Sequence, residues 1–340
     1  MSGALSVASM IQVPDSFDRK AVRWKFTVGI VLFLVWTYFT GEVRGDHYVF
    51  CALFLGLFWS GSDKAAYFGY LALPFLLVGV LYDNLKLALP LRPEIHVKDL
   101  YDWELAWFGV DTANGRQILP EWFKDHPVVL FDFFCGLAYI TYLLEVFGVG
   151  ALLFFKDVGG LQRLAWGWLL INILGMITWI AYPAAPPWYV EQYGLGPAVM
   201  DALPSAAGAA RFDDLIGVGV FASFYSRNAN VFGAMPSLHC GYPTLVLCVV
   251  WRYGWRWRVP TGAFLALVAF SAVYLRHHYV LDVLAGFVYG VMAYTGIWLV
   301  TRWRAHDVEA KENVRLAGFG VAADPARPND GASPQQGSGT

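Results

Sequence analysis

Stretches of apolar residues recur along most of this chain, and they constrain its fold more than any other feature. A membrane-spanning helix needs about 20 mostly apolar residues, or ~17 at the short end. Charged residues make up only 15% of the 340 residues, compared with about 25% in an average soluble domain. We expect eight spanning helices, over residues 23–40, 47–59, 65–82, 128–155, 164–182, 236–251, 259–277 and 280–303. The sequence therefore predicts an all-α fold, a polytopic helix bundle in a membrane.

The basic residues that flank these runs predict the orientation of the bundle. Cytoplasmic flanks of membrane helices carry an excess of lysine and arginine. Such residues cluster around residue 23, between the fourth and fifth runs, between the sixth and seventh runs, and around residue 303. With eight spans all four clusters fall on one side, which predicts cytoplasmic N and C termini. The short run 47–59 is kept as a span because this agreement requires it.

The same count divides the chain into three parts. We predict a cytoplasmic N-terminal segment over residues 1–22, a transmembrane catalytic domain over residues 23–303, and a disordered cytoplasmic tail over residues 304–340. The tail is rich in glycine, proline, alanine and serine, a composition typical of disorder. The long connections 83–127 and 183–235 would lie on the non-cytoplasmic face, together with the turn between the last two runs.

Composition excludes several classes of partner. A net charge of -2 gives no basic field for nucleic acid. The four cysteines have neither the spacing of metal ligands nor that of a disulfide framework, and no carboxylate cluster suits Mg²⁺. We therefore expect a membrane protein that acts without nucleic acid, metal or cofactor.

A histidine and an aspartate stand four residues apart at the start of the last apolar run. On a helix, His278 and Asp282 would share one face. An ionised carboxylate in an apolar helix is costly and needs a partner, and the imidazole is the obvious one. The carboxylate would fix the ring tautomer and make the other nitrogen a better nucleophile. The alternative is a structural hydrogen bond that satisfies a buried pair.

The segment Pro236-Ser237-Leu238-His239 introduces the sixth run. Proline suits the first turn of a helix, so the motif predicts a loop that enters a helix N-terminus. Such a terminus offers free N–H groups and the positive end of a dipole to an anion. Ser237 would add a hydroxyl donor and His239 a proton. A capped helix start with an interfacial histidine is the alternative.

The predicted topology brings both motifs to the non-cytoplasmic ends of the last three helices. A nucleophilic histidine with its aspartate, an anion-binding helix start and a second histidine are the parts needed for phosphoryl transfer through a phosphohistidine. In that chemistry positioning and charge neutralisation dominate. Basic residues on the same face would hold the phosphate, and arginine suits bidentate binding. The candidate phosphate-binding residues are Ser237, Arg211, Arg276, Arg92, Arg227 and His277.

These motifs resemble those of the type 2 phosphatidic acid phosphatase superfamily. The superfamily's Pro-Ser-x-His motif is matched by Pro236, Ser237 and His239. Its His-x-x-x-Asp motif is matched by His278 and Asp282.

Two departures set the chain apart from ordinary members. The superfamily carries Ser-Arg ahead of the His-x-x-x-Asp motif, but here Ala272 follows Ser271. The superfamily's first motif, Lys-x6-Arg-Pro, has no match before Pro236, since Lys86 and Arg92 are one residue too close.

The departures fit one branch, and the chain is similar to the fungal inositol phosphorylceramide synthases. The similar stretches are residues 92–97, 182–189, 210–213, 231–234 and 277–279. The resemblance covers roughly residues 81–286 and implies a six-helix lipid-phosphatase-like core over about residues 65–303.

What this resemblance implies is the transfer of phosphoinositol, or a similar phospho-head group, from phosphatidylinositol to a ceramide, with release of diacylglycerol. His278 would be the nucleophile and Asp282 its orienting partner. His239 would protonate the leaving alkoxide and then act as base on the ceramide hydroxyl, while Ser237 and Arg211 hold the phosphate. The active site would face the periplasm or outside in a bacterium, or the Golgi lumen in a eukaryote.

Two other functions stay open at this point. A lipid phosphate phosphatase, hydrolysing phosphatidic acid or a prenyl (pyro)phosphate, would use the same histidine chemistry with water as acceptor. The long connections are rich in tryptophan, proline and leucine, which favours transfer because they could cover the site and exclude water. A transporter or scaffold with degenerate motifs is the third reading, and it would tolerate His278→Ala.

Overall fold

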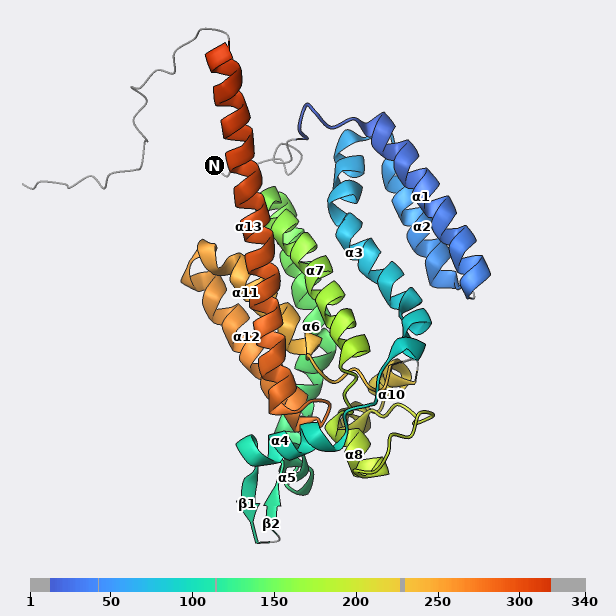
Figure 1. The fold of residues 1–340 in the computed structure, drawn as a ribbon, viewed down its shortest axis with the longest axis vertical. Coiled ribbons are helices and arrows are strands. Elements are labelled where there is room, and N and C mark those ends of the chain that lie inside the picture. Colours follow the sequence, from blue (N-terminus) through green and yellow to red (C-terminus); the bar gives the residue numbers. More distant parts are fainter. Residues whose placement is uncertain (1–12, 42, 114, 227–229, 319–340) are drawn as a thin grey trace, which may run out of the picture. The chain divides into compact units, whose positions relative to one another are not determined.

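The computed structural model describes residues 13–41, 43–113, 115–226 and 230–318 (Figure 1). The longer helices are α1 (Arg19–Thr40), α2 (Gly45–Trp59), α3 (Asp63–Ala88), α4 (Lys98–Phe108), α6 (Val129–Lys156), α7 (Val158–Ala181), α11 (Leu238–Val250), α12 (Trp255–Tyr274) and α13 (Val280–Gly318). The short elements are η2 (Leu89–Leu91), the antiparallel strands β1 (Val110–Thr112) and β2 (Gly115–Gln117), α5 (Leu119–Asp125), α8 (Pro187–Tyr193), η3 (Ala207–Ala209), α9 (Ala210–Ile216), α10 (Val220–Tyr225) and η4 (Trp251–Tyr253).

Each of the eight apolar runs is helical, so the prediction of an all-α, polytopic membrane protein is confirmed. Six helices in the described part of the chain are long and apolar enough to cross a membrane, namely α1, α3, α6, α7, α12 and the first part of α13. The other two, α2 and α11, have 15 and 13 residues. Their crossing of the membrane stays a prediction.

The end of the chain is described separately. Helix α13 continues to Gly318, beyond the predicted end of the span at residue 303. Among the described residues, those from Trp298 to Gly318 belong to a separate unit. The rest of the predicted tail, residues 319–340, lies outside the described residues, as do residues 1–12 of the predicted N-terminal segment.

Polar residues at the ends of the apolar runs explain where helices begin. Asp18 accepts two backbone N–H bonds at the start of α1, and Asp157 accepts one from Gly160 at the start of α7. Such side chains satisfy N–H groups that the helix itself leaves unpaired. Asp157 also directly follows Lys156, the last residue of α6. One aspartate therefore separates two spans.

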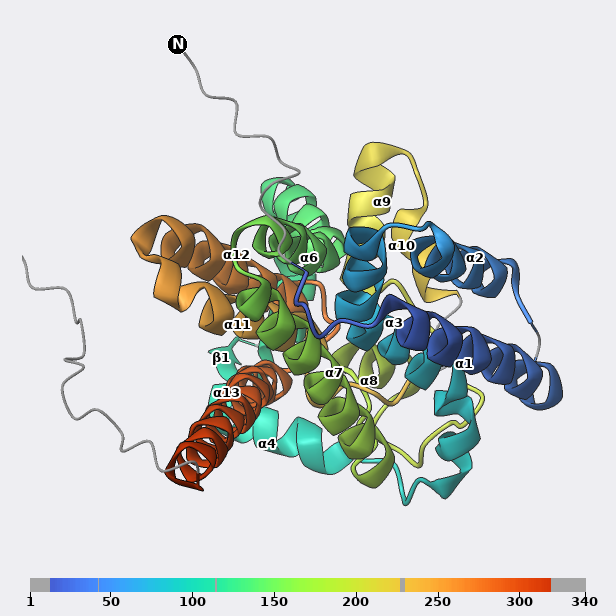
Figure 2. The same ribbon diagram turned by 90° about the horizontal axis from the view of Figure 1, so that it is seen from above.

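Helix α11 lies at the centre of the bundle. It packs against α6, α7 and α12, and α3 packs on α7 (Figure 2). Leu164, Ile171 and Leu245 are fully buried between these helices. In a membrane, close packing rather than removal from water holds helices together.

Two glycines bring α13 against α11. A Cβ at Gly290 would lie 2.6 Å from the Cβ of Thr244, and a Cβ at Gly286 would collide with the Ser237 carbonyl. Small residues at such positions let two helix backbones approach closely. The Ser237 N–H donates to the Asp282 carbonyl at 3.0 Å. The starts of α11 and α13, which carry the two motifs, are therefore held together.

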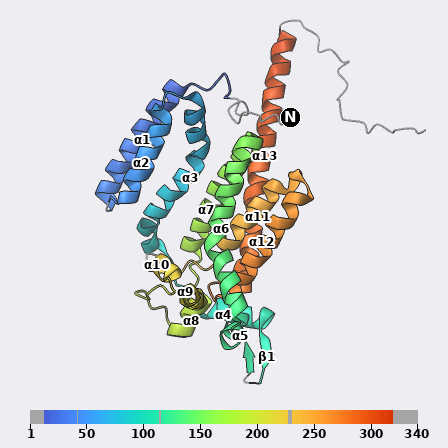
Figure 3. The same ribbon diagram turned by 180° about the vertical axis from the view of Figure 1, so that it is seen from behind.

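The two long connections fold into short elements at one end of the bundle. Helices α4, α5, α8, α9 and α10 gather where α11 and α13 begin (Figure 3). Single β-bridges join His96 to Ala184 and Ala184 to Gly233, which ties segments far apart in the sequence. Ile118, Ala234 and Tyr279 share one buried cluster there. These connections therefore pack over the start of α13.

Candidate active site

His278 lies in the turn between α12 and α13. Its Nδ1 is 3.4 Å from Oδ2 of Asp282, and both side chains are buried. The expectation that the two share a helix face was wrong in one respect: α13 begins at Val280, so His278 precedes the helix. The pair still forms because Asp282 also accepts the Tyr279 N–H at 2.9 Å, which folds the turn back over the first turn of the helix. One carboxylate therefore holds the backbone of the turn and lies beside the ring that the turn presents.

The backbone of this turn is strained. Arg276 has φ 63°, a left-handed conformation that costs a non-glycine residue about 1–2 kcal/mol. The Trp188 N–H donates to its carbonyl at 3.2 Å, and the N–H groups of His277 and His278 both donate to the Ala272 carbonyl at 3.1 Å. Strained residues of this kind gather at functional sites, where the surrounding structure holds them in place.

His239 faces His278 from the first turn of α11. Its Nδ1 is 3.2 Å from Nε2 of His278. The Tyr139 hydroxyl is 3.1 Å from the same Nδ1, and the Tyr139 ring stacks on His239 with 4.1 Å between centroids. Because Nδ1 of His278 is turned toward Asp282, its Nε2 is the nitrogen left for reaction. In this arrangement Nε2 of His278 could act as a nucleophile and Nδ1 of His239 could donate a proton to the same bound group.

Ser237 occupies the N-cap position of α11. The helix begins at Leu238, so Pro236 lies before it rather than in its first turn as the motif suggested. The Ser237 hydroxyl caps no helix N–H, and it is buried with no hydrogen-bond partner among the described groups. A buried hydroxyl of this kind remains available as a donor to an anion.

Two of the predicted arginines lie beside the same turn. Arg211 Nε donates to Asp132 at 2.6 Å, and one of its terminal nitrogens is buried without a partner among the described groups. Arg276 pairs with Glu191 at 3.3 Å. Burial lowers the pKa of the Arg276 guanidinium, Glu191 opposes the shift, and the nearby charge of Arg211 adds to it. The charges of the two guanidinium groups therefore influence each other across this turn.

The other predicted phosphate ligands have contacts elsewhere. Arg92 donates to the Trp179 carbonyl at 3.0 Å. His277 Nε2 is 3.1 Å from the Ala206 carbonyl, so this nitrogen carries the hydrogen. Burial, with the charges of its neighbours, lowers the pKa of His277 to about 3, so its ring is neutral. Arg227 lies outside the described residues. Phosphate binding by these three stays a prediction.

Sequence reasoning missed Glu104, whose side chain is fully buried. Its carboxylate accepts the N–H of Val280 at 2.9 Å and of Leu281 at 3.1 Å, the first two residues of α13. Burial raises the pKa of Glu104 to about 7, with the two N–H bonds opposing the shift and the Asp282 charge adding to it. The signal in the sequence is faint: Leu100 and Glu104, four residues apart, form the buried face of α4.

Sequence reasoning also missed the aromatic side chains around His239. Tyr139 and Tyr142 both come from α6, three residues apart, and the Tyr142 ring lies 4.5 Å from His239. Tyr225 stacks on His277 at 4.5 Å. These rings hold the imidazoles in place and keep the region around them apolar.

The chain is similar in sequence to several known proteins. A sequence profile of the PAP2 superfamily matches residues 100–296, which include both motifs. The chain is 34% identical over 283 residues to a phosphoinositol dihydroceramide synthase of Bacteroides thetaiotaomicron, covering 78% of this chain and 92% of that protein. No solved structure shows significant similarity to this chain.

Fungal proteins match over a shorter region. An inositol phosphorylceramide synthase of Candida albicans is 29% identical over 223 residues, which is 63% of this chain and 45% of that protein. The catalytic subunit of the Schizosaccharomyces pombe enzyme is 32% identical over 205 residues, which is 60% of this chain and 47% of that protein. The chain thus spans about half the length of these fungal relatives. With the profile match and the Bacteroides relative, these findings show that the chain belongs to the PAP2 superfamily, in the branch that contains the inositol phosphorylceramide synthases.

Proposed function

We propose that this protein transfers a phosphoinositol group from a glycerophospholipid to a ceramide-like lipid alcohol through a phosphohistidine intermediate. The observation that carries the proposal is the pair of facing histidines, with His239 Nδ1 and His278 Nε2 3.2 Å apart and Asp282 behind His278. The relatives are named as synthases of phosphoinositol dihydroceramide and of inositol phosphorylceramide, which supports this donor and acceptor over water.

In the first half of the reaction the histidine rings part to admit the phosphodiester of the donor. Nε2 of His278 attacks phosphorus, and the bond from phosphorus to the glycerol oxygen breaks. His239 gives its proton to that oxygen, and diacylglycerol leaves. Asp282 stabilises the ring of His278 as it gains positive charge. A positioned proton donor contributes about 10²–10⁴ in rate.

In the second half the acceptor hydroxyl takes the place of diacylglycerol. His239, now neutral, accepts the hydroxyl proton as the oxygen bonds to phosphorus. The bond between phosphorus and His278 breaks, and both histidines return to their starting states. The product is the phosphoinositol ester of the lipid alcohol.

We assign the non-reacting phosphate oxygens to Ser237, Arg211 and Arg276. The first two each have a buried donor without a protein partner among the described groups, and the charge of Arg211 acts on Arg276. Charge-assisted bonds from such donors stabilise a phosphoryl group as its charge spreads over the oxygens. Arg92 and His277 are further candidates, and the contacts they already make favour them less.

Orientation is part of the proposal. With cytoplasmic termini, the catalytic domain over residues 23–303 opens toward the periplasm, the outside or a Golgi lumen. Ala113 lies exposed after β1, and Ser60 lies exposed between α2 and α3. A membrane-impermeant maleimide applied to intact cells should label Ala113→Cys and spare Ser60→Cys. Labelling of both variants would place the two residues on one side and contradict the span of α3, and labelling of Ser60→Cys alone would reverse the predicted orientation.

The activity itself is tested with purified protein in detergent that contains EDTA. The substrates are labelled phosphatidylinositol, with and without ceramide. We expect a new lipid that contains inositol and phosphate, formed when ceramide is present. Release of phosphate from phosphatidic acid, with no lipid product from phosphatidylinositol, would refute the transferase and leave a phosphatase in its place.

A further inference from the structure

A cavity lies between α1, α2 and α3, and neither His239 nor His278 lines it. It encloses about 770 Å³, and its walls are mostly apolar. Along α1 the lining runs from Lys25 to Trp36, about 16 Å at ~1.5 Å per residue. That length is about half of the ~30 Å hydrocarbon thickness of a bilayer, and the volume falls within the range of about 300–1,000 Å³ for ligand sites. The cavity therefore suits a hydrocarbon chain from one leaflet.

A second cavity adjoins the first. It encloses about 420 Å³, and its lining from α2, α3, α6 and α7 contains no ionisable side chain among the residues described. The two cavities share four lining residues, Phe50, Phe54, Leu76 and Gly79. Two apolar spaces on either side of one wall fit a lipid with two chains better than a lipid with one.

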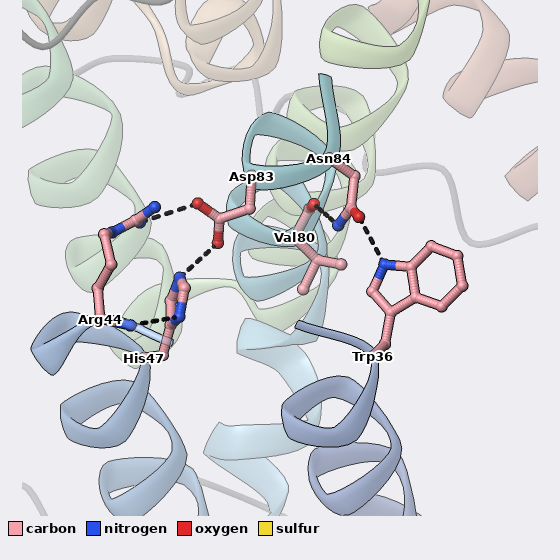
Figure 4. A network of polar contacts seen from close by, with 6 residues as sticks. All are labelled: Trp36, Arg44, His47, Val80, Asp83 and Asn84. Atoms are coloured by element: carbon pink, nitrogen blue, oxygen red, sulfur yellow. Dashed lines mark hydrogen bonds and ion pairs between the residues drawn. The ribbon is translucent and has the colours of Figure 1, made fainter. Parts of the chain in front are cut away.

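Polar side chains line one end of the larger cavity, and Figure 4 shows the contacts between them. Arg44 and His47 each contact a carboxylate oxygen of Asp83 at 2.8 Å. The Trp36 indole N–H donates to the Asn84 side chain at 2.6 Å. Because Asp83 balances the charge of Arg44, this end suits the hydroxyl, ester or amide groups of a neutral lipid rather than a phosphate.

Tyrosines connect this cavity to the catalytic histidines. Tyr82 lines the cavity, and its hydroxyl interacts with that of Tyr242. The Tyr242 ring lies 5.9 Å from the Tyr142 ring, which lies 4.5 Å from His239. A row of three tyrosines thus leads from the polar end of the cavity to the proposed proton donor.

We propose that the two cavities hold the chains of a neutral two-chain lipid alcohol, whose hydroxyl reaches His239 past Tyr82 and Tyr142. This inference rests on the proposed function. In a double displacement at His278, the leaving and the entering alcohol occupy the same side of phosphorus. One chain site therefore serves diacylglycerol as it departs and the ceramide-like acceptor as it enters.

Glycines in the cavity walls allow the site to be filled without a clash. A Cβ at Gly29 or at Gly79 would meet nothing within 4 Å, and both residues line the larger cavity. Gly79 also lines the smaller one. Gly148 on α6 is equally open but lines neither cavity. Gly29→Phe and Gly79→Phe are therefore the test variants, and Gly148→Phe is the matched control.

The first readout is the ratio of kcat/KM for a long-chain over a short-chain ceramide. Gly79→Phe should lower this ratio about tenfold, the effect of excluding about two methylene groups. Gly29→Phe should lower it less, and Gly148→Phe should leave it unchanged. With a short-chain phosphatidylinositol as donor, which leaves the cavities unfilled in the first half of the reaction, kcat/KM for the short-chain acceptor should be similar in wild type and all three variants. An unchanged ratio in Gly79→Phe would overturn the proposal.

The second readout needs no turnover. A ceramide with a photoreactive group in its chain should crosslink to peptides of α1–α3, and Gly79→Phe should remove that crosslink. If no transfer is detected with any acceptor, the proposed function fails. The crosslink alone then shows whether the cavities bind the chains of a lipid alcohol. Crosslinks elsewhere overturn the proposal. Crosslinks in the cavity combined with an unchanged chain-length ratio mean that bulk lipid fills it, which also overturns the proposal.

Discussion

Replacing Glu104 by alanine would uncouple the covering helix α4 from the first turn of α13. The Glu104 carboxylate accepts the N–H groups of Val280 and Leu281 at 2.9 and 3.1 Å. An unpaired buried N–H costs about 1–3 kcal/mol, so losing both bonds costs about 2–6 kcal/mol if nothing moves. A shift of the first turn of α13 relieves part of this cost, and it carries His278 along.

The catalytic effect follows from that shift. Displacing a reacting group by ~1 Å lowers the rate about 100-fold. We expect Glu104→Ala to lower kcat by about that factor while KM for the donor changes little, because Glu104 contacts the helix rather than the proposed phosphate ligands. Glu104→Gln keeps one oxygen as acceptor but turns its NH₂ toward the other N–H. Its kcat should fall about tenfold, as expected for the loss of one hydrogen bond.

Glu121 supplies a matched control in the same covering segment. Its carboxylate accepts the Tyr101 hydroxyl at 2.9 Å and the Ile118 N–H at 3.3 Å, and neither partner belongs to α13. Steady-state kinetics and thermal unfolding of purified protein in detergent should separate the two sites. Glu121→Gln should lower stability with kcat retained. Equal losses of kcat in Glu121→Gln and Glu104→Gln, or a wild-type kcat in Glu104→Ala, would refute this positioning role.

Glu104 also predicts a pH dependence of stability. Burial raises its pKa from 4.5 to about 7 in the folded protein. The folded state therefore binds more protons than the unfolded state between these values. The stability that Glu104 contributes is complete below pH 4.5 and is lost as the pH rises through 7. The shift corresponds to about 3 kcal/mol. Glu104→Gln should flatten the pH profile of the unfolding free energy in this window, and an unchanged slope would contradict the assignment.

The remaining predictions concern the turn and the two rings. His278→Ala and His239→Ala should each abolish transfer without loss of folded protein, and labelled phosphohistidine should disappear in the first; activity retained in His278→Ala would exclude it as nucleophile. Asp282→Asn should lower kcat by up to about 10⁴ through the wrong imidazole tautomer, and an unchanged rate would leave the pair a structural role. Tyr139→Phe keeps the stacked ring and loses the hydroxyl, so kcat should fall about tenfold, whereas a wild-type rate would make the ring the part that matters. Arg276→Gly should be about 1 kcal/mol more stable than Arg276→Ala, because glycine adopts φ 63° without strain; equal unfolding free energies would remove strain from the account.

The helices of the bundle were predictable because each rests on a local pattern. Apolar runs bounded by charged residues gave the eight helices, and the predicted end at residue 40 and start at residue 280 agree with α1 and α13. The helices of the long connections, α4, α5 and α8–α10, were not predicted. They lack a long apolar run and fold because they pack over the ends of other helices, which no local pattern records.

The site residues likewise divide into those that a local sequence pattern predicts and those that depend on contacts between distant segments. His278 and Asp282 were predictable as a pair because four residues separate them and each needs the other. Tyr139 and Glu104 reach the site from far along the chain, 100 residues before His239 and 176 before Val280. Such contacts depend on how helices are arranged and not on spacing. The strained φ of Arg276 could not be predicted either, because a left-handed conformation is expected from the sequence only where a glycine stands.

Transfer and hydrolysis need the same histidines, so whether the lipid alcohol or water is the acceptor depends on which of them reaches the proposed phosphohistidine. Glu104 gives a physical reason why a lipid alcohol is favoured over water as the acceptor. It belongs to α4, which packs over the start of α13, and it holds the first turn of α13 directly after His278. A movement of α4 that admits water would break these bonds and displace His278, the proposed nucleophile. The uncovered site is then a poor catalyst, so attack by water is disfavoured even when the site opens. A lipid alcohol that enters between the helices leaves α4 in place. By this reasoning, Glu104→Ala should raise the fraction of phosphoinositol lost to water relative to transfer, and an unchanged fraction would show that the cover and the catalytic turn act independently.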